Sequence, residues 1–91
     1  MTKKELAVII SNKVGISNVY SLELIDTIID TIKEIIIADQ SLELRGFGKF
    51  HLKKVKQKIG RNIGKNIEVV IPAHSKPAFM PYDEFKKLCI D

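Results

Sequence analysis

The sequence has no tryptophan and only one cysteine, Cys89, among its 91 residues. A single cysteine cannot form a disulfide within the chain, so we expect a reducing compartment, the cytoplasm, and a thiol that fills a small space in the core. No apolar run approaches the roughly 18 residues needed to cross a bilayer, and no charged-then-apolar leader opens the chain. We therefore expect a soluble protein with no membrane partner.

The residue patterns of catalytic and metal sites are also missing. There is no Ser/His/Asp or Cys/His set and no glycine-rich phosphate loop before a helix. His51 and His74 lie far apart in sequence and have no cysteine or carboxylate companions at metal-ligand spacing. We predict no enzyme, metal, cofactor or small-molecule substrate, and we interpret both histidines as ordinary surface or strand residues.

Acidic residues are absent between Arg45 and Ile67, whereas the same segment has eight basic residues. The eight are Arg45, Lys49, Lys53, Lys54, Lys56, Lys58, Arg61 and Lys65. Residues 1–44 carry four basic and seven acidic side chains, and residues 68–91 carry three and four, so the net charge of +4 comes from this block. A basic block in an otherwise slightly acidic chain is typical of a protein that binds a polyanion, and nucleic acid is the first candidate.

The first 40 residues show helical periodicity. Thr2 followed by Glu5 predicts a capped helix that Gly15 ends, and Ser17 or Ser21 can cap a second helix. Apolar residues of the second helix form one stripe: Leu22, Ile25, Ile28, Ile29, Ile32, Ile35 and Ile36. We expect an αα-hairpin whose isoleucine surface is too wide for one short helix to cover, so that part of it meets a second subunit.

Alternating residues predict strands after residue 40. Residues 42–45 form one strand, and two glycines around Phe47 allow a sharp bend or close backbone approach. Residues 49–59 and 67–71 form a long β-hairpin with a basic tip, which we expect to be flexible in the free protein because an isolated ribbon is marginally stable.

The remaining elements are short. A strand at 78–79 leads into a last helix, Asp83 to Cys89, with Phe85 and Leu88 facing inward. The prediction is a single α+β domain over residues 1–91, comprising a helical part with the expected dimerisation surface (1–40), a sheet with a basic arm (41–81) and a C-terminal helix (82–91).

Four short motifs carry a resemblance over essentially the whole chain: Gly-Phe-Gly-Lys-Phe at 46–50, Gly-Arg-Asn at 60–62, Ile-Pro-Ala at 71–73 and Pro-Ala-Phe-Met-Pro at 77–81. In this order they resemble the bacterial histone-like HU and integration host factor (IHF) family. The resemblance implies an intertwined homodimer or heterodimer with a three-stranded antiparallel sheet. It also implies two protruding β-arms that wrap double-stranded DNA through the minor groove.

The resemblance also assigns residues. Arg61 and Asn62 match the tip that enters the groove, and Lys3 matches a position near the flanks of bent DNA. With the basic block, the predicted DNA-binding set is Lys3, Arg45, Lys53, Lys54, Lys56, Lys58, Arg61, Asn62, Ile63, Lys65 and Lys76. The predicted dimer core is Ile29, Ile32, Ile36, Leu44, Phe47, Phe50 and Phe79.

One departure concerns the tip, where Ile63 replaces a proline that usually wedges between base pairs. Isoleucine is still an apolar wedge, but it lacks the fixed φ of proline. We predict an architectural protein of the nucleoid that binds, bends and compacts DNA with little sequence preference. The alternatives are an IHF-like sequence-preferring subunit of a heterodimer, since Arg45 before Gly46 resembles one IHF subunit, a small RNA-binding protein, and a scaffold that docks an acidic protein.

Overall fold

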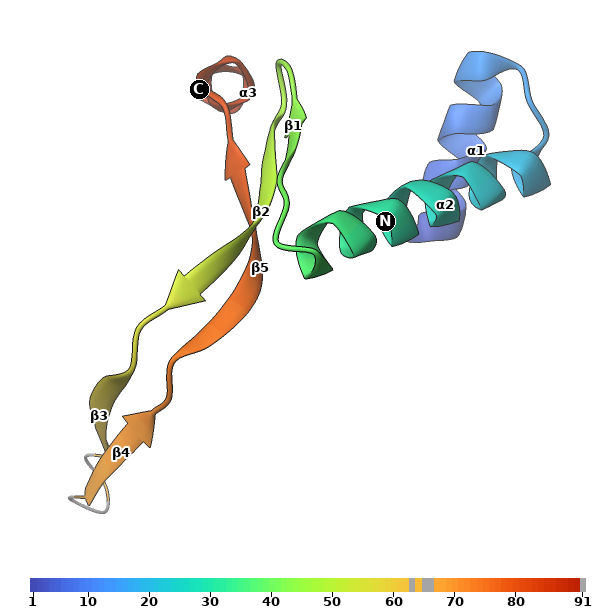
Figure 1. Cartoon of the computed structure of the whole chain (residues 1–91). Coiled ribbons are helices and arrows are strands. Elements are labelled where there is room, and N and C mark those ends of the chain that lie inside the picture. Colours follow the sequence, from blue (N-terminus) through green and yellow to red (C-terminus); the bar gives the residue numbers. More distant parts are fainter. Residues whose placement is uncertain (63, 65–66, 91) are drawn as a thin grey trace. The chain divides into compact units, whose positions relative to one another are not determined.

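The computed structural model describes residues 1–62, 64 and 67–90, and of residues 61 and 62 only the backbone. The chain divides into two compact units, residues 1–35 and 36–91. Figure 1 labels the elements. They are α1 (Lys3–Val14), α2 (Asn18–Ile37), β1 (Leu42–Leu44), β2 (Gly48–Val55), β3 (Lys58–Asn62), β4 (Ile67–Ile71), β5 (His74–Pro81) and α3 (Asp83–Leu88). The predicted α+β class, with an antiparallel sheet and a short last helix, is confirmed.

The ends of α1 follow the predicted capping residues. The Thr2 hydroxyl oxygen accepts a hydrogen bond of 3.2 Å from the Glu5 amide. Gly15 adopts the left-handed conformation with φ of 78°, and its amide donates to the Ser11 carbonyl. Only glycine adopts this conformation without a steric penalty, which is why the helix ends there.

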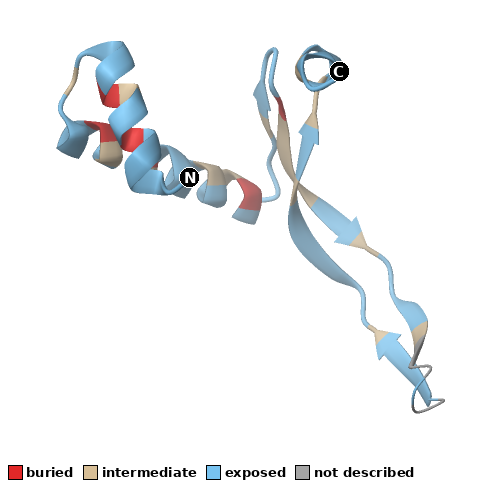
Figure 2. Ribbon diagram, turned by 180° about the vertical axis from the view of Figure 1, so that it is seen from behind, coloured by how far each residue is buried: buried red, intermediate tan, exposed pale blue. Residues whose placement is uncertain are grey.

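Ser17 caps the second helix, because its hydroxyl oxygen accepts a hydrogen bond of 3.1 Å from the Tyr20 amide. The alternative cap, Ser21, is wrong. Ser21 is fully buried, and its hydroxyl donates to the Ala7 carbonyl of α1 at 2.9 Å. A buried hydroxyl needs such a partner, so Ser21 serves the contact between the two helices. Figure 2 shows how few positions of the chain are buried.

The second unit is built on a three-stranded antiparallel sheet in the order β1-β2-β5. Phe50 of β2 lies between Leu42 of β1 and Phe79 of β5. Gly48 begins β2 where a Cβ atom would lie 2.5 Å from the Phe79 ring and 2.6 Å from the Met80 carbonyl oxygen. The glycine is therefore required by the close approach of β5, as the motif around Phe47 predicted.

Three rings hold α3 against this sheet. The Phe47 ring centroid lies 4.9 Å from that of Phe79 and 5.1 Å from that of Phe85, so the inward position of Phe85 is confirmed. The predictions for Leu88 and Cys89 are wrong, since Leu88 is 83% exposed and Cys89 is also exposed. Because α3 has only six residues, a single side chain reaches the rings, and Cys89 already lies at the helix cap.

The predicted hairpin is interrupted. β2 ends at Val55 and β3 begins at Lys58, while Pro72 and Ala73 separate β4 from β5. Proline cannot donate to a ladder, which explains a break at Pro72. The outer part, residues 56–73, contains the two-stranded β3–β4 ribbon and is called the arm below (Figure 1).

The strand predicted at 78–79 is longer than expected and runs over all of His74–Pro81. Its two prolines are tolerated because β5 pairs only with β2 and is an edge strand.

Candidate nucleic-acid interface

The arm has exposed aliphatic side chains on both faces of its β3–β4 ladder. In the β3–β4 ladder Ile59 pairs with Val70, and Gly60 pairs with Val69 on the other face. Ile59 is 66% exposed and Val70 57% exposed. A two-stranded ribbon without a covered apolar face is only marginally stable in water. The arm therefore gains contacts only when another molecule covers it.

Four of the predicted DNA-binding lysines lie where the sheet passes into the arm. Lys53 and Lys54 lie near the end of β2. Lys56 lies in the segment between β2 and β3, and Lys58 is the first residue of β3. All four are exposed. Lys76 joins them, because it lies directly opposite Lys53 in the β2–β5 register. Like charges at directly opposed positions repel each other, and an anion between them would relieve the repulsion.

Arg45 does not join this group. It follows β1 at the Gly48 end of β2, whereas the arm begins at the Val55 end. Seven residue steps of a strand separate these ends by about 23 Å. The strand register therefore places Arg45 away from the lysines with which it shares the basic block.

Two predicted lysines make ion pairs. The Lys3 amino group lies 2.6 Å from Asp26 Oδ1 within the helical unit, and the Lys54 amino group lies 3.6 Å from Asp39 Oδ2. All four side chains are at least 46% exposed, so these pairs contribute little to stability. Neither lysine is withheld from a phosphate by its carboxylate.

The tip residues are described only in part. Arg61 and Asn62 end β3, where their backbones pair with Glu68 and Ile67. Ile63 and Lys65 lie outside the described residues, so the predicted wedge stays a prediction.

The two faces of the three-stranded sheet differ in chemistry. One face carries Phe50, Leu52 and Phe79. Alternation places five lysine or histidine side chains on the other face, which we call the basic face: Lys49, His51 and Lys53 of β2, and His74 and Lys76 of β5. Glu43 of β1 lies on the same face, opposite Lys49. Sequence analysis gave the two histidines no role. Each histidine lies two residues from a lysine, and this spacing was the signal that the sequence offered. Only the register of β2 with β5 shows that the side chains of the two strands share one face.

The hydrogen bonding of the two imidazoles also differs. His74 Nδ1 lies 2.9 Å from the carbonyl oxygen of Pro72. His51 Nδ1 is enclosed and has no hydrogen-bond partner within the described part of the chain.

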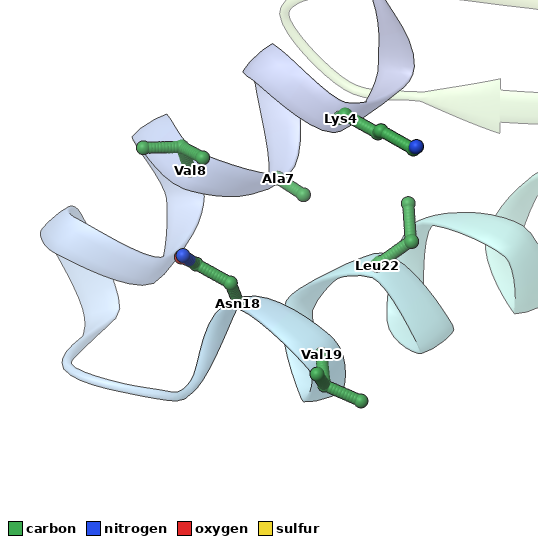
Figure 3. A pocket seen from close by; sticks show the side chains of 6 residues that line it. All are labelled: Lys4, Ala7, Val8, Asn18, Val19 and Leu22. Carbon is green, nitrogen blue, oxygen red and sulfur yellow. The ribbon is translucent and has the colours of Figure 1, made fainter.

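The helical unit has a small apolar pocket that lies apart from these residues in the sequence. Figure 3 shows its lining between α1 and α2, made by Lys4, Ala7, Val8, Asn18, Val19 and Leu22. None of the predicted DNA-binding residues lines it. Over residues 1–62, 64 and 67–90, no group of three or more His, Cys, Asp or Glu side chains could hold a metal ion. Within the same residues, no helix combines the length and apolar character of a membrane span.

Residues 1–89 match the family model described as bacterial DNA-binding protein. The chain belongs to this family, the one that contains HU and IHF. Its members are architectural DNA-binding proteins and not enzymes.

Among curated relatives, the alpha subunit of integration host factor from an Anaeromyxobacter species is 31% identical over 94% of this chain and 87% of its own length. The prophage-derived DNA-binding protein HU 2 of Bacillus subtilis is 31% identical over 94% of both chains.

Two solved structures share the fold. Anabaena HU, crystallised with DNA, has a TM-score of 0.89 and 28% identity, covering 98% of this chain and 97% of its own. An HU variant from Thermotoga maritima has a TM-score of 0.76 over 99% of this chain and 100% of its own. At 24% identity, the second supports the fold alone.

Proposed function

We propose that this protein is an architectural component of the bacterial nucleoid, located in the cytoplasm, that binds double-stranded DNA through the minor groove. It bends and compacts the duplex with little sequence preference. One observation carries the proposal: an exposed two-stranded ribbon joins the sheet among five exposed lysines, Lys53, Lys54, Lys56, Lys58 and Lys76. The similarity to an HU protein crystallised with DNA supports it.

The mechanism follows from the chemistry of the arm. Each lysine that neutralises a phosphate releases a condensed counterion, which gives affinity without reading the sequence. The open aliphatic side chains Ile59, Val69 and Val70 lose contact with water when the arm lies against the sugar walls of the groove. Arg61 and Asn62 enter the groove at the tip, and Ile63 acts as the wedge that unstacks a base step.

A second copy of the chain completes the protein in this proposal. Apolar side chains of the predicted dimer core are open in the single chain: Ile29 is 39% exposed, Leu44 38%, Phe47 41% and Phe79 37%. Exposed aromatic and aliphatic side chains of this kind, on each of the two units, are typical of an obligate interface. We infer a homodimer that presents two arms, one for each side of the duplex, and a heterodimer with a related chain would present the same surfaces.

The salt dependence of binding tests the proposal. With about 6–10 phosphate contacts per dimer, affinity for a short duplex should fall by about 10³–10⁵-fold between 50 and 200 mM salt. Fluorescence anisotropy measures the affinity, and energy transfer between dyes at the two ends of the same duplex measures the bend. An affinity that does not change with salt would contradict phosphate-based binding, whereas binding without a change in energy transfer would contradict bending alone.

A sequence-preferring subunit of a heterodimer is the second candidate, supported by the similarity to IHF alpha subunits. Selection of bound duplexes from a random pool separates the two, because enrichment of one motif would favour this candidate.

A small RNA-binding protein is less well supported. Sequence-specific RNA recognition usually stacks unpaired bases on aromatic side chains, and the sequence of the arm contains none. Competition between duplex DNA and single-stranded RNA at fixed salt distinguishes these ligands. If the protein is instead a scaffold that docks an acidic protein, it should not bind nucleic acid even at low salt.

A further inference from the structure

We propose that His74, assisted by His51, is a phosphate ligand that makes DNA binding depend on a bound proton. The inference rests on the proposed function and adds a regulating group to the same interface. His74 begins β5 beside the arm, opposite Val55 and two residues from Lys76, on the basic face of the sheet. Its side chain is exposed.

The hydrogen bond to Pro72 fixes how the His74 ring can act. A carbonyl oxygen only accepts, so Nδ1, at 2.9 Å from it, must carry the hydrogen. In the neutral ring Nε2 then has a bare lone pair, which cannot donate to a phosphate oxygen. Only the imidazolium has a hydrogen on both nitrogens. While Nδ1 keeps its hydrogen bond to Pro72, His74 can therefore donate to a phosphate only in its protonated form.

On the basic face, the charged neighbours of His74 in the paired strands are basic, whereas the carboxylate of Asp39 pairs with Lys54 of the other face. Along and across the strands its nearest basic neighbours are Lys76 and Lys53, with His51 beyond Lys53. The nearest carboxylate in the paired strands on this face is Glu43, which lies opposite Lys49 at the far end of β2. No carboxylate of this face therefore replaces a phosphate as the counter-ion of an imidazolium at His74.

His51 has the supporting role. Its Nδ1 is enclosed and has no hydrogen-bond partner among the described residues, so we assign any contact with a phosphate to Nε2. Because Nδ1 has no acceptor, nothing fixes the tautomer, and the neutral ring can also place its hydrogen on Nε2. Binding at His51 therefore does not require a proton as strictly as binding at His74.

The size of the effect follows from counterion release. Histidine is the side chain that ordinarily changes charge between pH 5 and 8. One added phosphate contact steepens the slope of log affinity against log salt concentration by about 0.9. Relative to 1 M salt, this contact therefore raises the affinity at 0.1 M salt by about eightfold. We expect the affinity of the dimer, with two His74 side chains, to be at least about tenfold higher near pH 6 than near pH 8. The dependence on salt should be steeper at the lower pH.

Substitutions of His74 provide the test, with anisotropy of a labelled duplex at both pH values and constant salt. The affinity of His74→Gln should be nearly the same at the two pH values. It should equal the weaker affinity that the parent protein has near pH 8. His74→Lys should bind at both with the tighter affinity. His51→Gln should keep most of the pH dependence.

Two outcomes would overturn the inference and leave the proposed function intact: equal affinity of the parent at both pH values, or full pH dependence in His74→Gln. Absence of DNA binding by the parent at both pH values would instead overturn the proposed function and this inference with it. Circular dichroism of each variant checks that the substitution leaves the fold unchanged.

Discussion

At the scale of single residues, Gly48 shows how one missing side chain sets the packing of the sheet. A Cβ atom there would meet the Phe79 ring and the Met80 backbone at 2.5–2.6 Å. Such local requirements were predictable, because a glycine on each side of Phe47 and the capping residues Thr2 and Gly15 act through near neighbours. Leu88 and Cys89 were not predictable, since their exposure depends on how far α3 extends past the aromatic rings.

Gly48→Ala should therefore lower the free energy of unfolding by about 1–3 kcal/mol or more, as expected when a methyl group enters a packed site that includes rigid backbone. Gly60→Ala is the matched control, because its Cβ would lie 3.8 Å from the nearest atom, the Val69 carbonyl oxygen. Urea unfolding at one protein concentration compares the two. If Gly48→Ala is as stable as the parent protein, the Phe79 ring and the Met80 backbone move aside without cost, which would contradict the prediction.

At the scale of elements, the arm and the three-stranded sheet differ in what supports them. Sequence periodicity predicted the strands, but it did not predict the break at residues 56 and 57 or the full length of β5. Both depend on which residues pair across strands, and alternation within one strand does not report its partner. For the same reason the basic face emerged only from the register, with Lys53 opposite Lys76.

Hydrogen exchange should separate these two elements. In the free protein, ladder amides of β3 and β4 should exchange faster than those of β2 and β5, because the arm has no covered apolar face. Saturating DNA should protect the arm and change the sheet much less. Equal protection of both elements without DNA would contradict the expected flexibility, and an arm that stays unprotected with DNA would contradict its role in binding.

At the scale of the whole molecule, the question is what covers the apolar side chains that the single chain leaves open. The isoleucine stripe indicated a second subunit from the sequence alone. Exposure of Phe47 and Phe79, which also contact each other, adds an aromatic patch on the sheet unit. Which chain provides the cover cannot be deduced from one sequence, because an identical and a related partner present the same apolar chemistry.

If the partner is identical, folding is coupled to association, and the stability of the pure protein must depend on its concentration. The midpoint of thermal unfolding should rise as the protein is concentrated from low micromolar upward. Phe79→Ala should lower the midpoint at every concentration, because it removes a ring from both the aromatic cluster and the proposed interface. Val19→Ala, at a side chain 71% exposed and outside the predicted dimer core, is the control and should leave the midpoint nearly unchanged. A midpoint independent of concentration, with a monomer mass by light scattering, would exclude the homodimer. Restoration of the concentration dependence by adding a related chain would then identify a heterodimer.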